Sequence, residues 1–207
     1  MVAGLCLMAA LNGHVADPVD AAIARYRTIR SYEVTVRSSS TDGSQIIHYS
    51  YRKPGFIRME FVEPHRGAVL IYNPDTRKVR LWPFGISAFP SLTLDPDNSL
   101  IQGPGGQRVD HSDVGALLDN VKALQRRGTM RVIGRQELFG FQTLHVMVSG
   151  EPGVTAANVA RYELWFDTSN CMPVKVESRD ARDELIETVV MDDFRIDIDF
   201  PERFFDP

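Results

Sequence analysis

Ten short segments in which apolar and polar residues alternate constrain the fold of this chain more than any other feature. They cover residues 32–39, 45–52, 56–62, 68–72, 78–82, 130–138, 143–149, 159–167, 174–179 and 185–196. Alternation with a period of two is typical of strands, and seven of the nine intervening stretches are six residues long or shorter. Such short turns join antiparallel neighbours, because parallel strands need long crossover connections. The sequence therefore predicts one large, mostly antiparallel sheet arranged mainly as a meander.

The alternation also predicts that one face of this sheet is apolar and the other is solvated. The apolar positions are clearest in two segments, as Ile57, Met59 and Phe61 in the first and as Tyr162, Leu164 and Phe166 in the second. Charged residues stand between them. Trp82 and Trp165 fall on the polar-facing positions, either as shields of the sheet or as lips of a cavity. A twisted sheet of this size has to curl around its apolar face.

Two amphipathic helices are predicted beside the sheet. The first begins after the N-cap residue Asp17 and runs for about 13 residues. The second runs from Ser112 to about Arg127, and Gly128 is predicted to end it. Its apolar stripe consists of Val114, Leu117, Leu118, Val121 and Leu124. Two helices cannot cover such a sheet as a full layer. We therefore expect an α+β fold, an open half-barrel of about ten to eleven strands whose apolar concave face the helices cover.

The first sixteen residues differ in character from the rest of the chain. Residues 2–11 form an uncharged apolar run, and the small residue Ala16 stands at the expected cleavage point a few residues later. A run of this length is too short to span a bilayer but suits the apolar region of a signal peptide. We expect residues 1–16 to be a signal peptide cleaved near Ala16, and residues 17–207 to be a single domain. The alternative is an apolar N-terminal helix that packs on the core.

Composition and motifs exclude several classes of function. The chain has 23 Lys and Arg against 27 Asp and Glu, and this net charge of −4 disfavours a nucleic-acid binder. Its two cysteines exclude a disulfide scaffold and a Cys-rich zinc module. No phosphate-binding loop, nucleophile elbow or metal-ligand spacing of histidines is found. We expect a protein that is not an enzyme and that has no catalytic residues, no cofactor and no metal.

The order of several motifs resembles the LolA/LolB-type lipoprotein-carrier superfamily. The matching stretches are residues 51–61 (Tyr-Arg-Lys-Pro-Gly-Phe-Ile-Arg-Met-Glu-Phe), 70–75, 164–167, 172–177, 193–196 and the closing Pro-Glu-Arg-Phe-Phe of 201–205. Together they extend over most of residues 19–207. The resemblance implies a half-barrel with a helical lid, a hydrophobic cavity for acyl chains and a periplasmic location. It also implies lipid or lipoprotein acyl chains as ligands, with transfer towards the outer membrane as a chaperone does.

Site residues follow from the resemblance and from strand parity. The expected cavity lining is Ile57, Met59, Phe61, Leu117, Leu118, Val121, Tyr162, Leu164 and Phe166. Lys53 stands where the carriers typically have an arginine that ties the lid to the barrel, and we expect it to form a gate with the 112–127 helix. The implied partners include inner- and outer-membrane lipoprotein-sorting proteins. No nucleic acid is expected, and the chain is not expected to be an integral membrane protein.

Two other interpretations remain open at this point. The same fold resembles the amino-terminal domain of periplasmic anti-sigma-factor regulators, so the chain could be a lipid-sensing protein-interaction module. A barrel filled by its own side chains would hold no ligand. The long segment 83–110 also has two interpretations, as an extension at the cavity mouth or as a satellite apolar cluster on the barrel wall.

Overall fold

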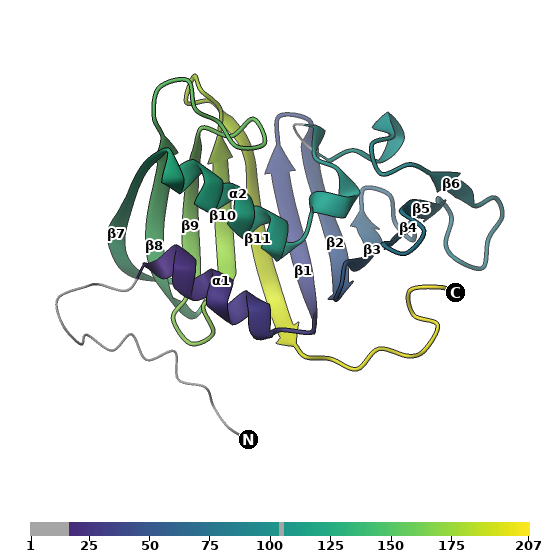
Figure 1. The fold of residues 1–207 in the computed structure, drawn as a ribbon. Coiled ribbons are helices and arrows are strands. Elements are labelled where there is room, and N and C mark those ends of the chain that lie inside the picture. Colours follow the sequence, from purple (N-terminus) through teal and green to yellow (C-terminus); the bar gives the residue numbers. More distant parts are fainter. Residues whose placement is uncertain (1–16, 104–105) are drawn as a thin grey trace. The chain divides into compact units, whose positions relative to one another are not determined.

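The computed structural model describes residues 17–103 and 106–207, and they form one open antiparallel sheet with two α-helices (Figure 1). The helices are α1 (Pro18–Thr28) and α2 (Val114–Arg126). The strands are β1 (Ser31–Ser40), β2 (Gly43–Arg52), β3 (Phe56–Glu63), β4 (Val69–Asn73), β5 (Lys78–Trp82), β6 (Leu92–Leu94), β7 (Gly128–Leu138), β8 (Phe141–Gly150), β9 (Arg161–Asp167), β10 (Pro173–Arg179) and β11 (Leu185–Ile196). The expected α+β class with an open antiparallel sheet is confirmed.

The strand order is β6-β5-β4-β3-β2-β1-β11-β10-β9-β8-β7. Two meanders, β1 to β6 and β7 to β11, therefore meet where β1 lies beside β11. All ten predicted strands are present, with ends within about two residues of the expected ones. The eleventh, β6, lies in the segment 83–110 that was expected to be a loop, and two 3₁₀ turns follow it at Ser99–Ile101 and Val109–His111.

Both helices differ slightly from their predicted bounds, and the first has 11 residues instead of about 13. The second was expected to begin at Ser112, but α2 begins at Val114. The hydroxyl of Ser112 donates to the carbonyl oxygen of Val109 at 2.7 Å, so this serine closes the preceding 3₁₀ turn. The first helix begins as predicted, because Asp17 accepts hydrogen bonds from the amides of Val19 and Asp20. No helix within residues 17–103 and 106–207 is long and apolar enough to cross a membrane.

The described residues fall into two compact units. Unit 1 consists of residues 17–28 and Val114–Thr188, and unit 2 of Ile29–Asp113 and Val189–Pro207. The expected signal peptide, residues 1–16, lies outside the described residues. A single domain over 17–207 remains a prediction.

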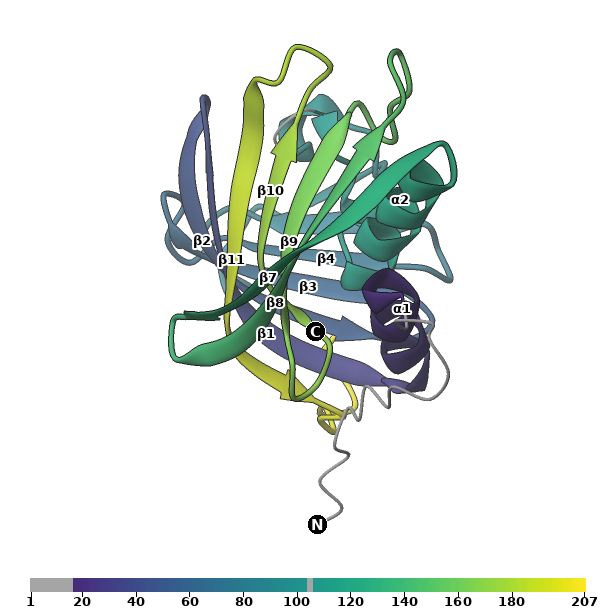
Figure 2. The same cartoon turned by 90° about the vertical axis from the view of Figure 1, so that its left-hand side faces the viewer.

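Unit 1 has its core between the helices and the sheet. Helix α2 lies on β7 and β8, and α1 packs against α2 (Figure 2). Strand register places Val146, Leu164 and Val176 side by side across β8, β9 and β10, and all three are buried. The apolar stripe predicted for α2 is buried at four positions: Val114, Leu118, Val121 and Leu124. The alternation in this half of the chain thus gives the expected apolar face.

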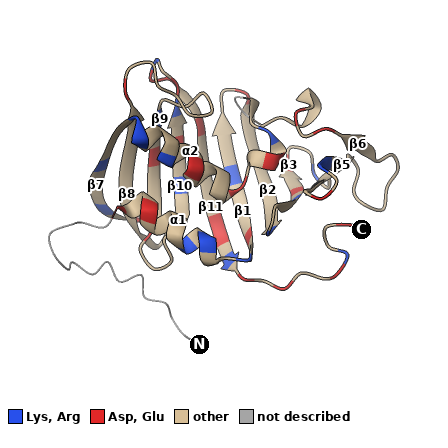
Figure 3. Ribbon diagram, in the orientation of Figure 1, with Lys and Arg blue, Asp and Glu red and all other residues tan. Residues whose placement is uncertain are grey.

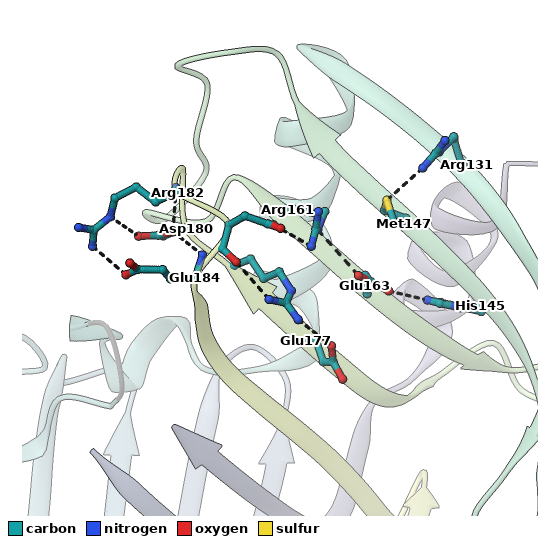
Figure 4. Close-up of polar contacts among 11 residues, drawn as sticks. Arg131, His145, Met147, Arg161, Glu163, Glu177, Asp180, Arg182 and Glu184 are labelled. Atoms are coloured by element: carbon teal, nitrogen blue, oxygen red, sulfur yellow. Dashed lines mark hydrogen bonds and ion pairs between the residues drawn. The ribbon is translucent and has the colours of Figure 1, made fainter. Parts of the chain in front are cut away.

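The opposite face of unit 1 carries a hydrogen bond and ion pairs between partly buried side chains (Figure 4). His145 Nε2 lies 3.0 Å from Glu163 Oε2, and the Arg161 guanidinium lies 2.7 Å from Asp183. Trp165 is 6% exposed, because it stacks on the His145 ring at 4.2 Å and lies under the Lys175 ammonium at 4.4 Å from its centroid. Trp165 therefore shields this face, which is polar but not fully solvated.

In unit 2 the prediction of one solvated face is wrong. All four positions from Val69 to Tyr72 of β4 are buried, so this strand is covered on both sides. On the face that was expected to be polar, Val69, Ile71 and Trp82 form a cluster with Phe205. The closing segment 200–205 supplies this cover. Its contribution depends on tertiary packing, which strand alternation does not report.

Arginines hold the closing segment in place. The Arg58 guanidinium lies 4.4 Å from the centroid of Phe204 and donates to the carbonyl oxygen of the same residue at 2.7 Å. Arg52 lies over the rings of Phe56 and Phe205 at 4.6 and 4.8 Å. A planar guanidinium can cover an aromatic face and still donate hydrogen bonds from its edge, as Arg58 does. A lysine does this less well.

Candidate functional site

A row of buried tyrosines lines the other face of unit 2. Tyr32 of β1 stacks on Tyr51 of β2 with ring centroids 5.1 Å apart, and on Phe194 of β11 at the same distance. Tyr49 lies 6.1 Å from Tyr32. The three tyrosines are 5% exposed or less. They give this face a large ring surface with only a few polar atoms, a composition that suits apolar ligands.

Tyr49 is also held by a polar contact at the end of its ring. Its hydroxyl lies 3.1 Å from the hydroxyl of Ser112, so the turn before α2 satisfies the polar end of a buried ring. Burial and, to a smaller extent, the charge of Asp113 hold the pKa of Tyr49 well above its usual value. The ring is therefore neutral at any physiological pH, and it cannot act as a base there.

Two of the expected cavity residues join this row. Ile57 pairs with Tyr51 and Met59 pairs with Tyr49 across β2 and β3, and they are 1% and 8% exposed. Phe61, the third expected residue of β3, is only half-buried and packs edge-on against His65. The tyrosines were not among the residues expected from the sequence. Alternation in the first two segments could have found them, since they share the face of Ile57 once the strands are aligned.

The other six expected cavity residues lie in unit 1. Leu118 and Val121 of α2, and Tyr162, Leu164 and Phe166 of β9, are 4% exposed or less, whereas Leu117 is half-buried. Burial raises the pKa of Tyr162 well above its usual value, and the charge of Glu187 adds to this shift. These side chains belong to the layer between α2 and the sheet. Their role in lining a ligand cavity remains a prediction.

Lys53, the expected gate, lies in the turn that joins β2 to β3. Its backbone amide donates to the carbonyl oxygen of Arg30 at 2.9 Å, and its peptide bond with Pro54 is cis. The residue is half-buried. The turn is thus tied to the chain segment that precedes β1, and a gating role for the side chain remains a prediction.

Asp17 and Lys122 join the two helices of unit 1. Besides capping α1, the Asp17 carboxylate accepts a hydrogen bond from Gln125 Nε2 at 2.6 Å and lies 3.4 Å from Lys122 Nζ. The same ammonium lies 2.6 Å from Asp20. Burial raises the pKa of Asp17, but the hydrogen bonds from Gln125 and from two backbone amides, together with the Lys122 charge, lower it by more. The pKa therefore lies below its usual value.

We expect Asp17→Asn to destabilise the protein by about 1 kcal/mol at pH 7. Asparagine is still a good N-cap, so the variant removes mainly the charge. Because folding lowers this pKa, the stabilisation is present above the unfolded value near 3.9 and is lost as the pH falls through the folded value. Urea unfolding across this range should therefore show the two proteins converging in acid. The more exposed Asp20→Asn is the control, and an equal loss there would contradict this assignment.

Potential metal ligands are scattered in the part of the chain that the structure describes. In residues 17–103 and 106–207, no group of three or more His, Cys, Asp or Glu side chains is arranged so that it could hold a metal ion.

The sequence matches no protein-family model and no curated protein. Solved structures do match. An uncharacterized conserved protein from Thermus thermophilus aligns at 10% identity over 90% of this chain and 91% of its own, with a TM-score of 0.56. LprF from Mycobacterium bovis aligns at 10% identity over 89% and 94%, with a TM-score of 0.54. MucB in complex with MucA(peri) aligns at 12% identity over 91% of this chain but 58% of the MucB chain, with a TM-score of 0.53.

A LolA superfamily protein from Nitrosomonas europaea matches less closely, with a TM-score of 0.38 at 12% identity over 93% of this chain and 99% of that chain. The fold shared with LprF is the kind of fold that the resemblance to the LolA/LolB-type superfamily predicts. At such low identities the likeness extends to the fold alone.

Proposed function

We propose that the protein is a periplasmic, non-enzymatic carrier that holds lipid or lipoprotein acyl chains and passes them towards the outer membrane. The observation that carries this proposal is the amphipathic helix α2, which lies over a buried apolar sheet face in a LolA-like fold. The apolar run of residues 1–16 supports export as a signal peptide cleaved near Ala16. No cofactor is required for this task.

The energetics of such a carrier favour whole acyl chains over small apolar molecules. Each methylene that leaves water contributes roughly 0.8 kcal/mol, so two or three chains suffice for tight binding. The candidate lining of unit 1 is the buried apolar set of β9 and α2, and that of unit 2 is the tyrosine row with Ile57 and Met59. Ring surfaces can accommodate flexible acyl chains, because hydrophobic and dispersion contacts are not directional.

Titration with a fluorescent fatty acid tests the proposal. We expect saturable binding, and we expect a ligand excess of 100-fold over Kd to raise the unfolding free energy by about 2.7 kcal/mol. A protein that binds no acyl probe, and whose melting temperature lipid does not change, would rule out the carrier.

The proposed gate is tested in the same assay. If Lys53 controls access, Lys53→Ala should change the rate of probe release while the melting temperature stays within about 2 °C of the wild type, because removing a half-exposed charge costs little. The exposed Arg77→Ala in unit 2 is a matched control, and it should alter neither quantity. A loss of stability in Lys53→Ala with an unchanged release rate would assign the residue a structural role.

A second candidate is a lipid-sensing interaction module of a periplasmic regulator. The structural likeness to MucB, solved in complex with MucA(peri), favours it. The two candidates differ in what happens after the acyl chain binds. A carrier delivers the bound probe to acceptor vesicles, whereas a sensor retains it and changes its affinity for a protein partner. Transfer of the probe to vesicles, followed by fluorescence, separates them.

A further inference from the structure

Exposed apolar side chains gather in one segment of unit 2, between β5 and α2. Phe89 is 93% exposed, Phe84 is 72% exposed and Leu100 is 65% exposed, and Leu92 of the edge strand β6 is 37% exposed. Half of the large, exposed apolar side chains identified in the described residues lie in this short stretch. Large exposed apolar side chains concentrated in one segment point to a surface that another molecule covers.

The segment is uncharged where it is most apolar. Residues 83–94 contain no Lys, Arg, Asp or Glu, and the loop between β5 and β6 is free of charged colouring in Figure 3. The first acidic residue after it, Asp95, is paired with Lys78 of β5 at 2.6 Å. No charged group in this loop therefore opposes its transfer into an apolar medium, and only the backbone and the hydroxyls of Ser87, Ser91 and Thr93 do.

One apolar residue of the segment is already used by the fold. Ile86 packs against the cluster of Val69, Ile71, Trp82 and Phe205, and this contact anchors the middle of the loop to the sheet. Phe84 and Phe89 flank it in the sequence and remain exposed. Anchoring at Ile86 fixes the loop near the sheet while the two rings stay available, so the expectation of a satellite cluster explains Ile86 but not the two phenylalanines.

The composition favours a lipid surface over a protein partner. Residues 83–107 contain no Tyr, Trp or Arg, the residue types that dominate protein interfaces. The side chains of phenylalanine and leucine have no polar group, so their burial among acyl chains leaves no hydrogen bond unmade. Exposed basic residues of β5 and its preceding turn, Arg77 and Arg80, lie next to the segment and suit phosphate headgroups. Arg80 pairs directly with Thr93 of β6.

We propose that residues 83–101 form a membrane-docking edge, in which Phe84, Phe89 and Leu92 enter the acyl region of a phospholipid bilayer while the protein remains peripheral. This inference concerns a surface outside the proposed acyl-chain site and does not depend on that site. Three apolar side chains give reversible attachment and not permanent insertion, since affinity for a membrane scales with the apolar area that enters it.

Sedimentation of the full chain with phosphatidylcholine vesicles tests the proposal. We expect the wild type to partition onto vesicles, and the double variant Phe84→Ser with Phe89→Ser to lose about tenfold in partition coefficient. Phe139→Ser is the matched control, because Phe139 is a 58% exposed phenylalanine in the turn between β7 and β8 of unit 1. It should bind vesicles as the wild type does. Since all three residues are exposed, melting temperatures should remain unchanged.

Several outcomes would overturn the docking edge. A wild type that does not bind vesicles would do so, as would an equal loss in Phe139→Ser. If light scattering shows a dimer that the double variant converts to a monomer, and neither form binds vesicles, the segment is an interface between two copies instead.

The fatty-acid titration without vesicles keeps the two proposals apart. We expect the double variant to bind the acyl probe as the wild type does. A wild type that docks on vesicles but binds no probe would refute the carrier and leave the docking edge in place, and the reverse result would refute only the docking edge.

Discussion

Replacing Leu118 with alanine is expected to lower the free energy of unfolding by about 2–5 kcal/mol, the usual cost of a large-to-small change at a closely packed site. Leu118 is 1% exposed and lies on the stripe of α2 that contains Val114, Val121 and Leu124. It belongs to the helix of unit 1 that packs directly on β7 and β8. Truncation leaves a void that the surrounding strands cannot fill without moving. Urea denaturation monitored by circular dichroism gives the change.

Leu117→Ala is the matched control for this prediction. Leu117 precedes Leu118 on the same helix but is only half-buried, so we expect a loss about half as large or smaller. The pair also bears on the carrier proposal. If Leu118 also borders space that an acyl chain fills, its truncation should change the affinity for the acyl probe as well as the stability. A large loss of stability, with unchanged probe binding, would instead assign Leu118 to a permanent core and move the lining elsewhere.

Strand positions could be predicted from the sequence because half-buried strands alternate strictly. Ile57 and Met59 were assigned to one face from parity alone, and register with Tyr51 and Tyr49 places them there. The same parity argument assigned Tyr162, Leu164 and Phe166 to one buried face of β9. Where one face of a strand packs on a core, a slip by a single residue would expose every apolar side chain. The pattern and the register therefore constrain each other.

The cover of the second face could not be predicted in the same way. Alternation marks Arg58 as outward and thus as solvated, yet its side chain is largely buried under Phe204. The burial comes from a closing segment far away in the sequence, and the local pattern of β3 is the same whether or not that segment is present. In β4, Val69 and Ile71 alternate with the inward-facing Leu70 and Tyr72. The resulting unbroken apolar run was the one local indication that this strand is covered on both sides.

The candidate site was also predictable only in part from the sequence. Its apolar composition follows from the pattern, because positions that face a common core must be apolar. The polar contact that completes it does not follow from the pattern. The hydroxyl of Tyr49 finds its partner in Ser112, which the local sequence pattern assigned to the start of a helix. A serine near a helix start serves equally well as an N-cap or as the end of a 3₁₀ turn, and only the packing of Tyr49 against that turn decides between them.

Gly128→Ala is expected to destabilise the protein by about 3 kcal/mol or more, for a reason that the sequence did not indicate. Gly128 was predicted to end α2 as a helix-stop glycine, but it is the first residue of β7 and pairs with Gly150 of β8. A Cβ at this position would lie 2.0 Å from the carbonyl oxygen of Ser149 and 2.7 Å from the Cα of Gly150. Both contacts are with backbone, so no side-chain rotation relieves them, and the start of the β7–β8 pair has to open.

Gly55→Ala provides the control for Gly128→Ala, because an added Cβ at Gly55 meets the Pro74 side chain at an ordinary 3.6 Å. We expect its effect to stay within about 0.5 kcal/mol. Hydrogen exchange of the β7 and β8 amides should locate the loss in Gly128→Ala at the end of the pair next to α2. If Gly128→Ala unfolds like Gly55→Ala in urea, the close approach of the two strands is not required for stability.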